Sequence, residues 1–163
     1  MKAKPNHNEF TIFAPDQETA ARLQNFYDTE DEFCWSSGKW CEIIFDVPAG
    51  LLSNPAIVEI DLDLDAFKIS PDLLGQDVFI YLNGLRLASR HVTSRHLINL
   101  RTDGQTLRLK DNVLTIDTPD SVMPTQYGLK DNRTLGIQLF SIAGRVQQVA
   151  SRRIGKSAAF ANS

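Results

Sequence analysis

Three histidines and a serine are the residues of this sequence with the clearest potential for catalysis. His91 and His96 flank Ser94, but no cysteine or acidic residue accompanies them at the spacing of metal ligands, and His7 stands apart. A serine near histidines is not a triad, because a triad is defined by geometry and an oriented third group. The sequence also lacks a G-x-S-x-G elbow, a phosphate-binding loop and a G-x-G-x-x-G motif. We therefore expect no enzymatic activity, no metal and no other cofactor.

A second set of residues has the chemistry of sugar recognition, which combines flat aromatic faces with amide, carboxylate and guanidinium groups. The candidates are Trp35, Trp40, Tyr127, Asp131, Asn132 and Arg133. Each has a structural alternative, since Trp40 at the head of a strand would commonly belong to the core, and Asp131 with Arg133 would form an ion pair that stabilises the fold. The sequence thus predicts carbohydrate binding and leaves these alternatives open.

Four carboxylates alternate with apolar residues between residues 57 and 65, and carboxylates are the ligands that hard cations prefer. We call them the acidic stripe: Glu59, Asp61, Asp63 and Asp65. Successive carboxylates on one strand face lie roughly 7 Å apart, which is too far for one strand alone to enclose an ion at about 2.4 Å. We expect a solvated strand face, with a cation site as the alternative.

The two cysteines, Cys34 and Cys41, are too few for a disulfide scaffold and do not have the spacing of a zinc site. We expect free thiols, one or both of them buried. If the chain were exported, a bridge closing a short loop around Trp35 and Trp40 would be the alternative.

The candidate residues would be positioned by β-strands, and the clearest pair of strands surrounds Asn83-Gly84. Asn-Gly readily supplies the two positive-φ residues of a type I′ turn, so residues 77–88 are predicted to form a tight hairpin. In the expected register Leu82 faces Leu85, Tyr81 faces Arg86 and Ile80 faces Leu87. One face would belong to the core, namely Val78, Ile80, Leu82, Leu85 and Leu87. The opposite face, with Phe79, Tyr81 and Arg86, would be partly covered by another segment.

Alternating apolar residues between turn signals predict further strands at 41–47, 57–65, 96–100, 106–109, 113–116 and 135–142. The apolar run at 10–13 is expected either to add an edge strand or to cover an exposed apolar face. Short strands joined by regular turns favour a sandwich over an α/β fold. A short helix capped by Asp16 is expected before residue 28. The predicted organisation is an N-terminal extension with this helix (1–32), a β-sandwich domain (33–150) and a flexible tail (151–163).

Composition and charge narrow the classes of function. The chain of 163 residues suits one domain, and its net charge of −3 gives no reason to expect binding to nucleic acid or anionic lipid. No apolar run approaches the roughly 18 residues that a membrane span needs, and the start lacks the apolar core of a signal peptide. We expect a cytoplasmic location, with no membrane span and no nucleic-acid partner.

Four segments follow one another in an order that carries a family resemblance. They are W-S-S-G-K-W at 35–40, the strands around Asn83-Gly84, the segment at 109–119 and D-N-R-T-L-G-I at 131–137, of which D-x-R-x-L-G-I is the most specific. The order resembles small bacterial β-sandwich domains that look like galactose-binding jelly rolls. Those domains occur fused to or beside glycosyltransferases that build surface polysaccharides. The resemblance implies a glycan or a glycosyltransferase-type protein as partner, and it transfers no catalytic residue.

The predicted fold class is therefore all-β, a jelly-roll-like antiparallel β-sandwich with a short N-terminal helix. The expected function is that of a non-catalytic accessory or carbohydrate-binding module linked to bacterial polysaccharide biosynthesis. The alternative is an interaction or assembly domain that binds a partner protein through a sheet face or edge.

Overall fold

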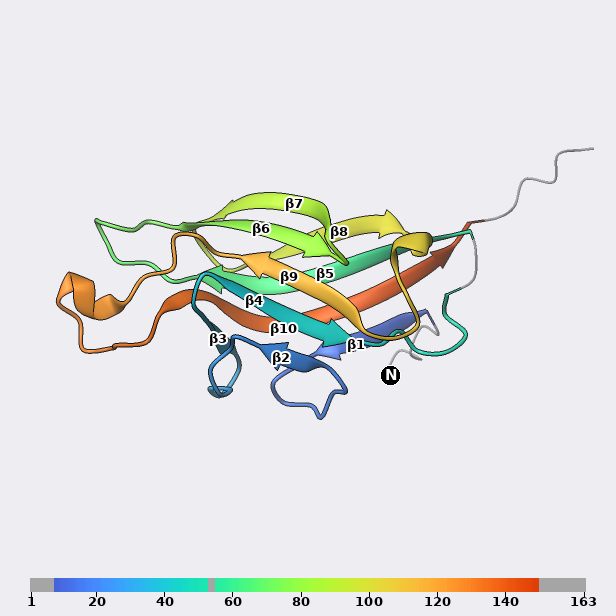
Figure 1. Cartoon of the computed structure of the whole chain (residues 1–163), viewed down its shortest axis with the longest axis horizontal. Coiled ribbons are helices and arrows are strands. Elements are labelled where there is room, and N and C mark those ends of the chain that lie inside the picture. Colours follow the sequence, from blue (N-terminus) through green and yellow to red (C-terminus); the bar gives the residue numbers. More distant parts are fainter. Residues whose placement is uncertain (1–7, 53–54, 150–163) are drawn as a thin grey trace, which may run out of the picture.

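The computed structural model describes residues 8–52 and 55–149, which form two five-stranded antiparallel sheets packed face to face (Figure 1). Sheet 1 has the order β1 (Glu9–Phe13), β10 (Leu135–Gln148), β5 (Ala56–Ala66) and β8 (His96–Asp103), and β3 (Cys34–Ser37) also pairs with β10. Sheet 2 has the order β2 (Arg22–Gln24), β4 (Trp40–Phe45), β9 (Asn112–Asp117), β6 (Gln76–Leu82) and β7 (Leu85–Val92). Two short 3-10 helices, η1 (Gly104–Thr106) and η2 (Pro124–Tyr127), lie in connections. The prediction of an all-β sandwich is confirmed.

The core lies between the sheets and follows the alternation of the strands. On β5, every second residue from Val58 to Leu64 is at most 1% exposed, while the acidic stripe points outward. The inward residues of β4, which begin with Cys41, face this layer from sheet 2 and are equally buried. Alternation with period two therefore predicts both strands correctly, because one face of each is core and the other points outward.

The hairpin of β6 and β7 is confirmed, with Leu82 opposite Leu85 and Tyr81 opposite Arg86 as expected, but its register shifts beyond these pairs. Asn83 and Gly84 have φ of 50° and 85°, as a type I′ turn requires. Ile80 pairs with Ala88 instead of Leu87, because a β-bulge inserts one extra residue in β7. Leu87 is consequently only half-buried, and Leu85 at the turn is 52% exposed. The prediction that both leucines belong to the core is therefore wrong.

The predicted N-terminal helix is wrong. The segment forms a turn and then β2, whose Arg22 and Gln24 pair with Ile44 and Glu42 of β4. Long-range pairing of this kind satisfies the backbone, whereas a helix so short is marginal by itself. The predicted edge strand at 10–13 does form, as β1 beside β10. The predicted tail (151–163) lies outside the described residues, and so does His7.

The strand predicted at 106–109 is also wrong, because Asn112 holds this segment as a loop. The Asn112 side chain accepts a hydrogen bond from the backbone N–H of Arg108 (2.8 Å) and donates one to its carbonyl (2.7 Å). These two bonds satisfy the backbone of Arg108 without a neighbouring strand. None of the helices in the described part of the chain has the length and apolar character needed to cross a bilayer.

Both cysteines are free and fully buried, as predicted for at least one of them. Cys34 lies on β3 of sheet 1 and Cys41 on β4 of sheet 2. Burial raises the pKa of the Cys34 thiol to about 12 and raises that of Cys41 well above its ordinary value. Both side chains therefore act as small apolar groups of the core.

Candidate functional site

A groove on the outer face of sheet 2 is built from neighbouring positions on four strands. In one row across the sheet, Asp117 on β9 lies between Trp40 on β4 and Phe79 on β6. In the adjacent row Tyr81 on β6 pairs with Arg86 on β7. Because neighbouring strands lie about 4.8 Å apart, these side chains border a common surface. The groove has a volume of about 490 Å³ and is lined by Lys39, Trp40, Phe79, Tyr81, Arg86, Asp117 and Pro119.

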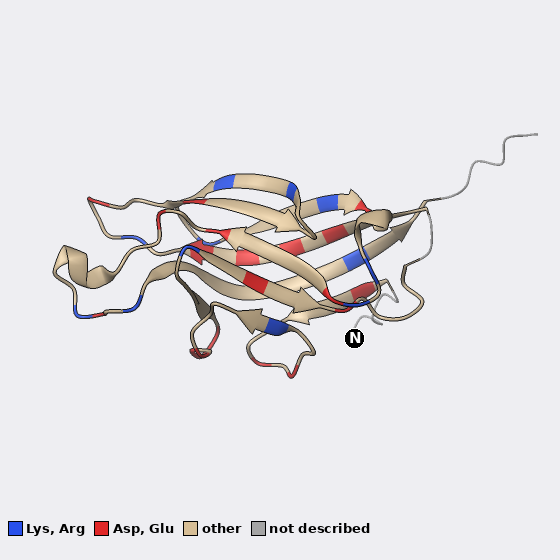
Figure 2. Ribbon diagram, in the orientation of Figure 1, with Lys and Arg blue, Asp and Glu red and all other residues tan. Residues whose placement is uncertain are grey.

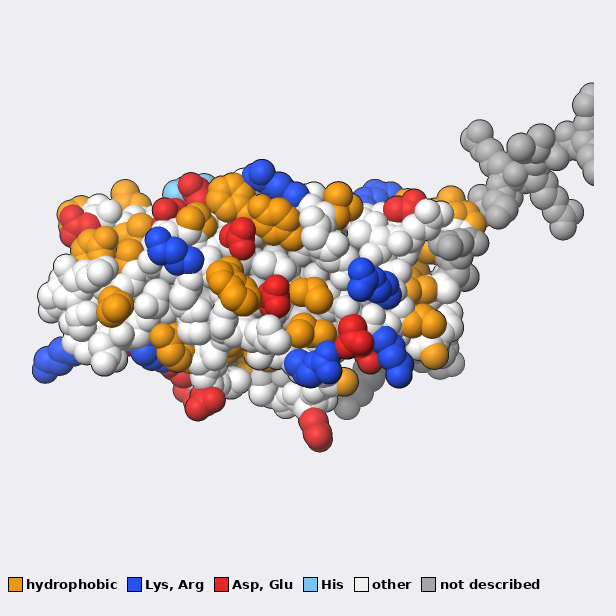
Figure 3. Space-filling view, in the orientation of Figure 1, with side chains coloured by type: hydrophobic (Ala, Val, Ile, Leu, Met, Phe, Trp, Pro, Cys, Tyr) orange, Lys and Arg blue, Asp and Glu red, His pale blue; other side chains and the backbone are white. Residues whose placement is uncertain are grey.

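The groove combines an exposed aromatic ring with charged groups. Trp40 is 45% exposed, so the alternative that it belongs to the core is wrong. The guanidinium carbon of Arg86 lies 4.9 Å from the centre of the Phe79 ring. Arg86 belongs to the same hairpin face as Phe79 and Tyr81, so this contact is not the cover by another segment that the sequence predicted. Figure 3 shows hydrophobic side chains interspersed with acidic and basic ones over β4, β9 and β6.

A buried cluster of hydroxyl groups positions one end of this groove. The backbone N–H of Thr118 donates to the carbonyl of Lys39 (2.8 Å), and the Ser121 hydroxyl donates to the carbonyl of Thr118 (2.8 Å). Gly136 of β10 faces this cluster, and a Cβ at that position would lie 2.4 Å from Ser121 Oγ, 2.7 Å from Ser36 Oγ and 2.8 Å from Thr118 Oγ1. Only glycine fits there, so the glycine of the D-x-R-x-L-G-I segment has a packing role next to the groove.

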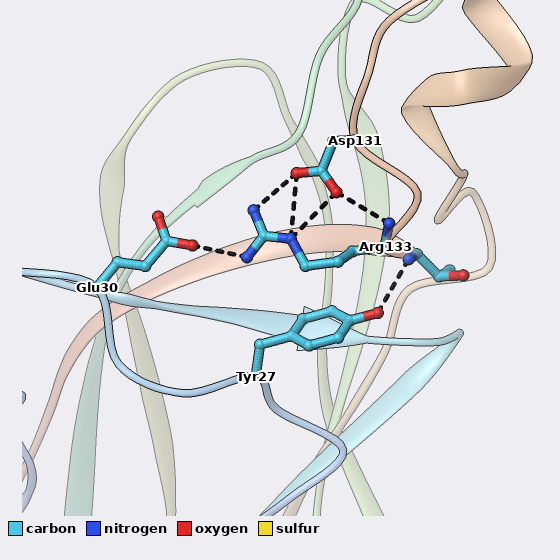
Figure 4. A network of polar contacts seen from close by, with 5 residues as sticks. Tyr27, Glu30, Asp131 and Arg133 are labelled. Carbon is cyan, nitrogen blue, oxygen red and sulfur yellow. Dashed lines mark hydrogen bonds and ion pairs between the residues drawn. The ribbon is translucent and has the colours of Figure 1, made fainter.

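Asp131 and Arg133 form an ion pair in the loop before β10 (Figure 4). Arg133 donates to both carboxylate oxygens of Asp131, with the shortest contact 2.7 Å, and also to Glu30 (2.6 Å). Its guanidinium carbon lies 5.3 Å from the centre of the Tyr27 ring, and the Tyr27 hydroxyl accepts a hydrogen bond from the N–H of Thr134. Hydrogen bonds from the Arg133 side chain, and then from its N–H, lower the pKa of Asp131. This geometry favours the structural alternative, because both side chains are already engaged.

The six residues predicted for sugar recognition do not form one site. Trp35 is half-buried on β3 of sheet 1, where its ring packs edge-on against Phe33 and Phe67 at centroid distances of 5.7 and 5.6 Å. Tyr127 at the end of η2 is 39% exposed, and Asn132 is exposed between the two members of the ion pair. Only Trp40 of the six lines the groove.

The sequence did single out some of the other groove residues. Phe79, Tyr81 and Arg86 share one face of the predicted hairpin, and their mixed polarity was the available signal. Lys39 and Asp117 carry no comparable signal, because they approach this face only through the pairing of β9 with β4 and β6.

The acidic stripe lies on the outer face of sheet 1, seen as the red positions along β5 in Figure 2. It points outward as predicted, but it is half-buried and neutralised by cations instead of simply solvated. Arg145 pairs with its first two carboxylates at 3.0 and 3.4 Å, Arg95 donates two bonds to the third, and Lys68 lies 2.9 Å from the fourth. Within residues 8–52 and 55–149, no group of three or more His, Cys, Asp or Glu side chains is arranged to hold a metal ion.

The histidines of the predicted polar turn contact groups other than a nucleophile. His91 Nδ1 lies 2.7 Å from the carboxylate of Asp77, and His96 Nδ1 lies 2.8 Å from the backbone carbonyl of Ser94. The described part of the chain therefore shows no serine hydroxyl bonded to a histidine base in this segment.

No family model matches this chain, and no curated protein matches it. Solved structures do match in fold. A GH26-CBM35 β-(1,4)-mannanase from Podospora anserina covers 90% of this chain with a TM-score of 0.53 and 11% identity, and this chain spans 29% of that chain. The C-terminal CBM6 of the laminarinase LamC from Zobellia galactanivorans covers 85% of this chain and 99% of its own, with a TM-score of 0.49 and 8% identity.

The CBM22-1 xylan-binding domain of Xyn10C from Paenibacillus barcinonensis covers 87% of this chain and 94% of its own, with a TM-score of 0.44 and 12% identity. Identities this low establish similarity of fold alone. The structural neighbours of this β-sandwich thus include carbohydrate-binding modules.

Proposed function

We propose that this chain is a non-catalytic carbohydrate-binding domain and that the groove on sheet 2 is its binding surface. The observation that carries the proposal is the row of Trp40, Asp117 and Phe79, in which an exposed indole stands beside a carboxylate on a rigid sheet. Side chains fixed on strands keep their geometry better than side chains on loops.

The groove residues offer the contacts that a sugar requires. The apolar face of a pyranose ring can stack on Trp40, since a large aromatic surface gains from covering apolar C–H groups. Asp117 accepts hydrogen bonds from hydroxyl groups, while Arg86 and Lys39 donate them. A groove with mostly apolar walls and a few convergent polar groups is the usual form of a small-ligand site.

The experiment is a screen on a glycan array followed by calorimetric titration of the best oligosaccharide. Trp40→Ala should abolish binding and leave the melting temperature nearly unchanged, because the side chain is half exposed. Tyr127→Ala is the matched control, an exposed aromatic residue outside the groove. Loss of binding in the Tyr127 variant with full binding in the Trp40 variant would refute the assignment of the groove.

We further propose that the domain serves bacterial polysaccharide biosynthesis in the cytoplasm, beside a glycosyltransferase. This finer role is supported by the resemblance of the segments 35–40, 109–119 and 131–137 to glycosyltransferase-associated domains. Co-purification of the tagged chain with a glycosyltransferase from the cytosolic fraction of its source cells would support it. Recovery of the chain outside the cytosol would contradict the proposed location.

A partner protein is the second candidate occupant of the groove. It is favoured by the composition of the surface, because Trp, Tyr and Arg dominate the energetic centres of protein interfaces. Capture of a protein that Trp40→Ala releases, together with no binding on the glycan array, would select this function over carbohydrate binding.

A further inference from the structure

The charges that line the groove are unbalanced. Lys39 and Arg86 are cationic and Asp117 is the single acidic residue among the lining side chains, whereas the chain as a whole has a net charge of −3. The lining side chains therefore carry one net positive charge, while Glu42 lies in the row of Tyr81 beside them. Lys39 and Arg86 are the groups of this lining that attract an anionic ligand.

Three arginines elsewhere in the fold are already paired with carboxylates. Arg133, Arg145 and Arg95 each contact a carboxylate at 3.0 Å or less. Among the residues that the structure describes, Lys39 and Arg86 have no ion-pair partner. Their charges are thus available to a ligand in the groove.

Arg86 is also held in place without using its hydrogen-bond donors. Its guanidinium lies over the Phe79 ring at 4.9 Å, and its strand position is fixed by pairing with Tyr81. Stacking on an aromatic face leaves the N–H groups at the edge of the guanidinium free, and their fork matches a planar carboxylate with two parallel bonds.

We infer that the groove prefers acidic saccharides: one sugar ring stacks on Trp40, and the carboxylate of a uronosyl residue further along the same oligosaccharide pairs with Arg86. Lys39, next to Trp40 at the other side of the groove, adds attraction for the negative chain. Asp117 accepts a hydrogen bond from a ring hydroxyl between them. The inference rests on the proposed function and names the class of glycan for the same site.

The test compares oligosaccharides that differ only in the carboxylate. The probes are tetramers of β-1,4-linked glucuronate and glucose, and of α-1,4-linked galacturonate and galactose, titrated into the full chain. At least one acidic tetramer should bind about tenfold more tightly than its neutral counterpart, as one charge-assisted pair would provide. Arg86→Gln should reduce this ratio to near one, because it removes the charge-assisted pair that only the acidic tetramer makes. The preference should also shrink as ionic strength rises, because the groove is open to solvent.

Arg101→Gln is the control, since it removes the same charge from an exposed position on β8 of sheet 1. If it lowers the preference as much as Arg86→Gln does, net charge and not the groove is responsible, and the inference is overturned. Equal affinity for acidic and neutral tetramers would overturn the inference and leave carbohydrate binding intact. A sulfated glucose tetramer that binds as tightly as the glucuronate would overturn the assignment to a carboxylate. Binding of no glycan at all would overturn the proposed function as well.

Discussion

Replacing Gly136 by alanine tests whether the buried hydroxyl cluster positions the groove. The new methyl group would lie under 3.0 Å from three hydroxyl oxygens at once, those of Ser36, Thr118 and Ser121. Contacts this short cannot be accommodated without movement, and all three side chains are small and held by hydrogen bonds.

The expected loss of stability follows from two contributions. Overpacking a well-packed interior costs about 1–3 kcal/mol. Displacing one hydroxyl from its partner adds about 1 kcal/mol. We therefore expect Gly136→Ala to lower the free energy of unfolding by about 2–4 kcal/mol, or the melting temperature by roughly 5–15 °C for a domain of this size. Urea denaturation measures it, with an unchanged m-value as the sign that only stability has changed.

A second substitution, Ser121→Ala, tests which contact causes the loss of stability. Ser121 Oγ would be the closest atom to the new methyl group, at 2.4 Å, so Ser121→Ala should relieve part of the overpacking. The double variant should then be more stable than the sum of the two single losses predicts, by about 1 kcal/mol or more. Additive losses, or a Gly136→Ala protein as stable as the wild type, would refute this account of the cluster.

Three further predictions concern other parts of the fold. Arg133→Ala should lower the free energy of unfolding by about 1 kcal/mol near neutral pH. Because Arg133 lowers the pKa of Asp131, this loss is present above about pH 4 and vanishes as the pH falls through the pKa of Asp131 in the folded protein. An equal loss at about pH 2 and pH 7 in thermal melts would contradict this prediction. Cys34 and Cys41 should resist a thiol reagent at about pH 8 in the native protein and react fully in denaturant, since both are buried and their pKa values are raised; fast labelling of the native protein would contradict their placement. Gly84→Val should cost about 1 kcal/mol or more, because φ is 85° at this position, and an unchanged melting temperature would argue against the turn.

Local patterns in the sequence predicted most strands because each pattern reflects a local cause. The strict alternation from residue 57 to 65 corresponds to β5, whose inward side chains are core and whose outward ones carry the acidic stripe. Asn83-Gly84 predicted its turn because positive φ is a property of those two residues. The pairing of Asp131 with Arg133 was also accessible, as they lie two residues apart.

The wrong strand and helix predictions lie where the structure depends on pairing with other segments of the chain. The helix expected after Asp16 gives way to β2 because β4 offers it a strand to pair with, and nothing within that segment indicates this partner. The bulge at Leu87 moves this leucine out of the core, although the turn beside it was predicted correctly.

The groove could not have been assembled from the sequence for the same reason. Trp40, Asp117 and Phe79 are far apart in the chain and become neighbours only through the order of strands in sheet 2. The sequence therefore identified Trp40 as a candidate and grouped it with Trp35, which lies on the other sheet.

The two tryptophans provide the most direct measurement of the central claim, that the groove on sheet 2 binds carbohydrate. Trp40 lies in the groove and Trp35 on sheet 1, so their indole N–H signals in a proton–nitrogen correlation spectrum report the two faces separately. Titration with the tightest-binding oligosaccharide should shift the Trp40 indole signal progressively to saturation and leave the Trp35 signal in place. A shift of the Trp35 signal with the Trp40 signal unmoved would contradict the account.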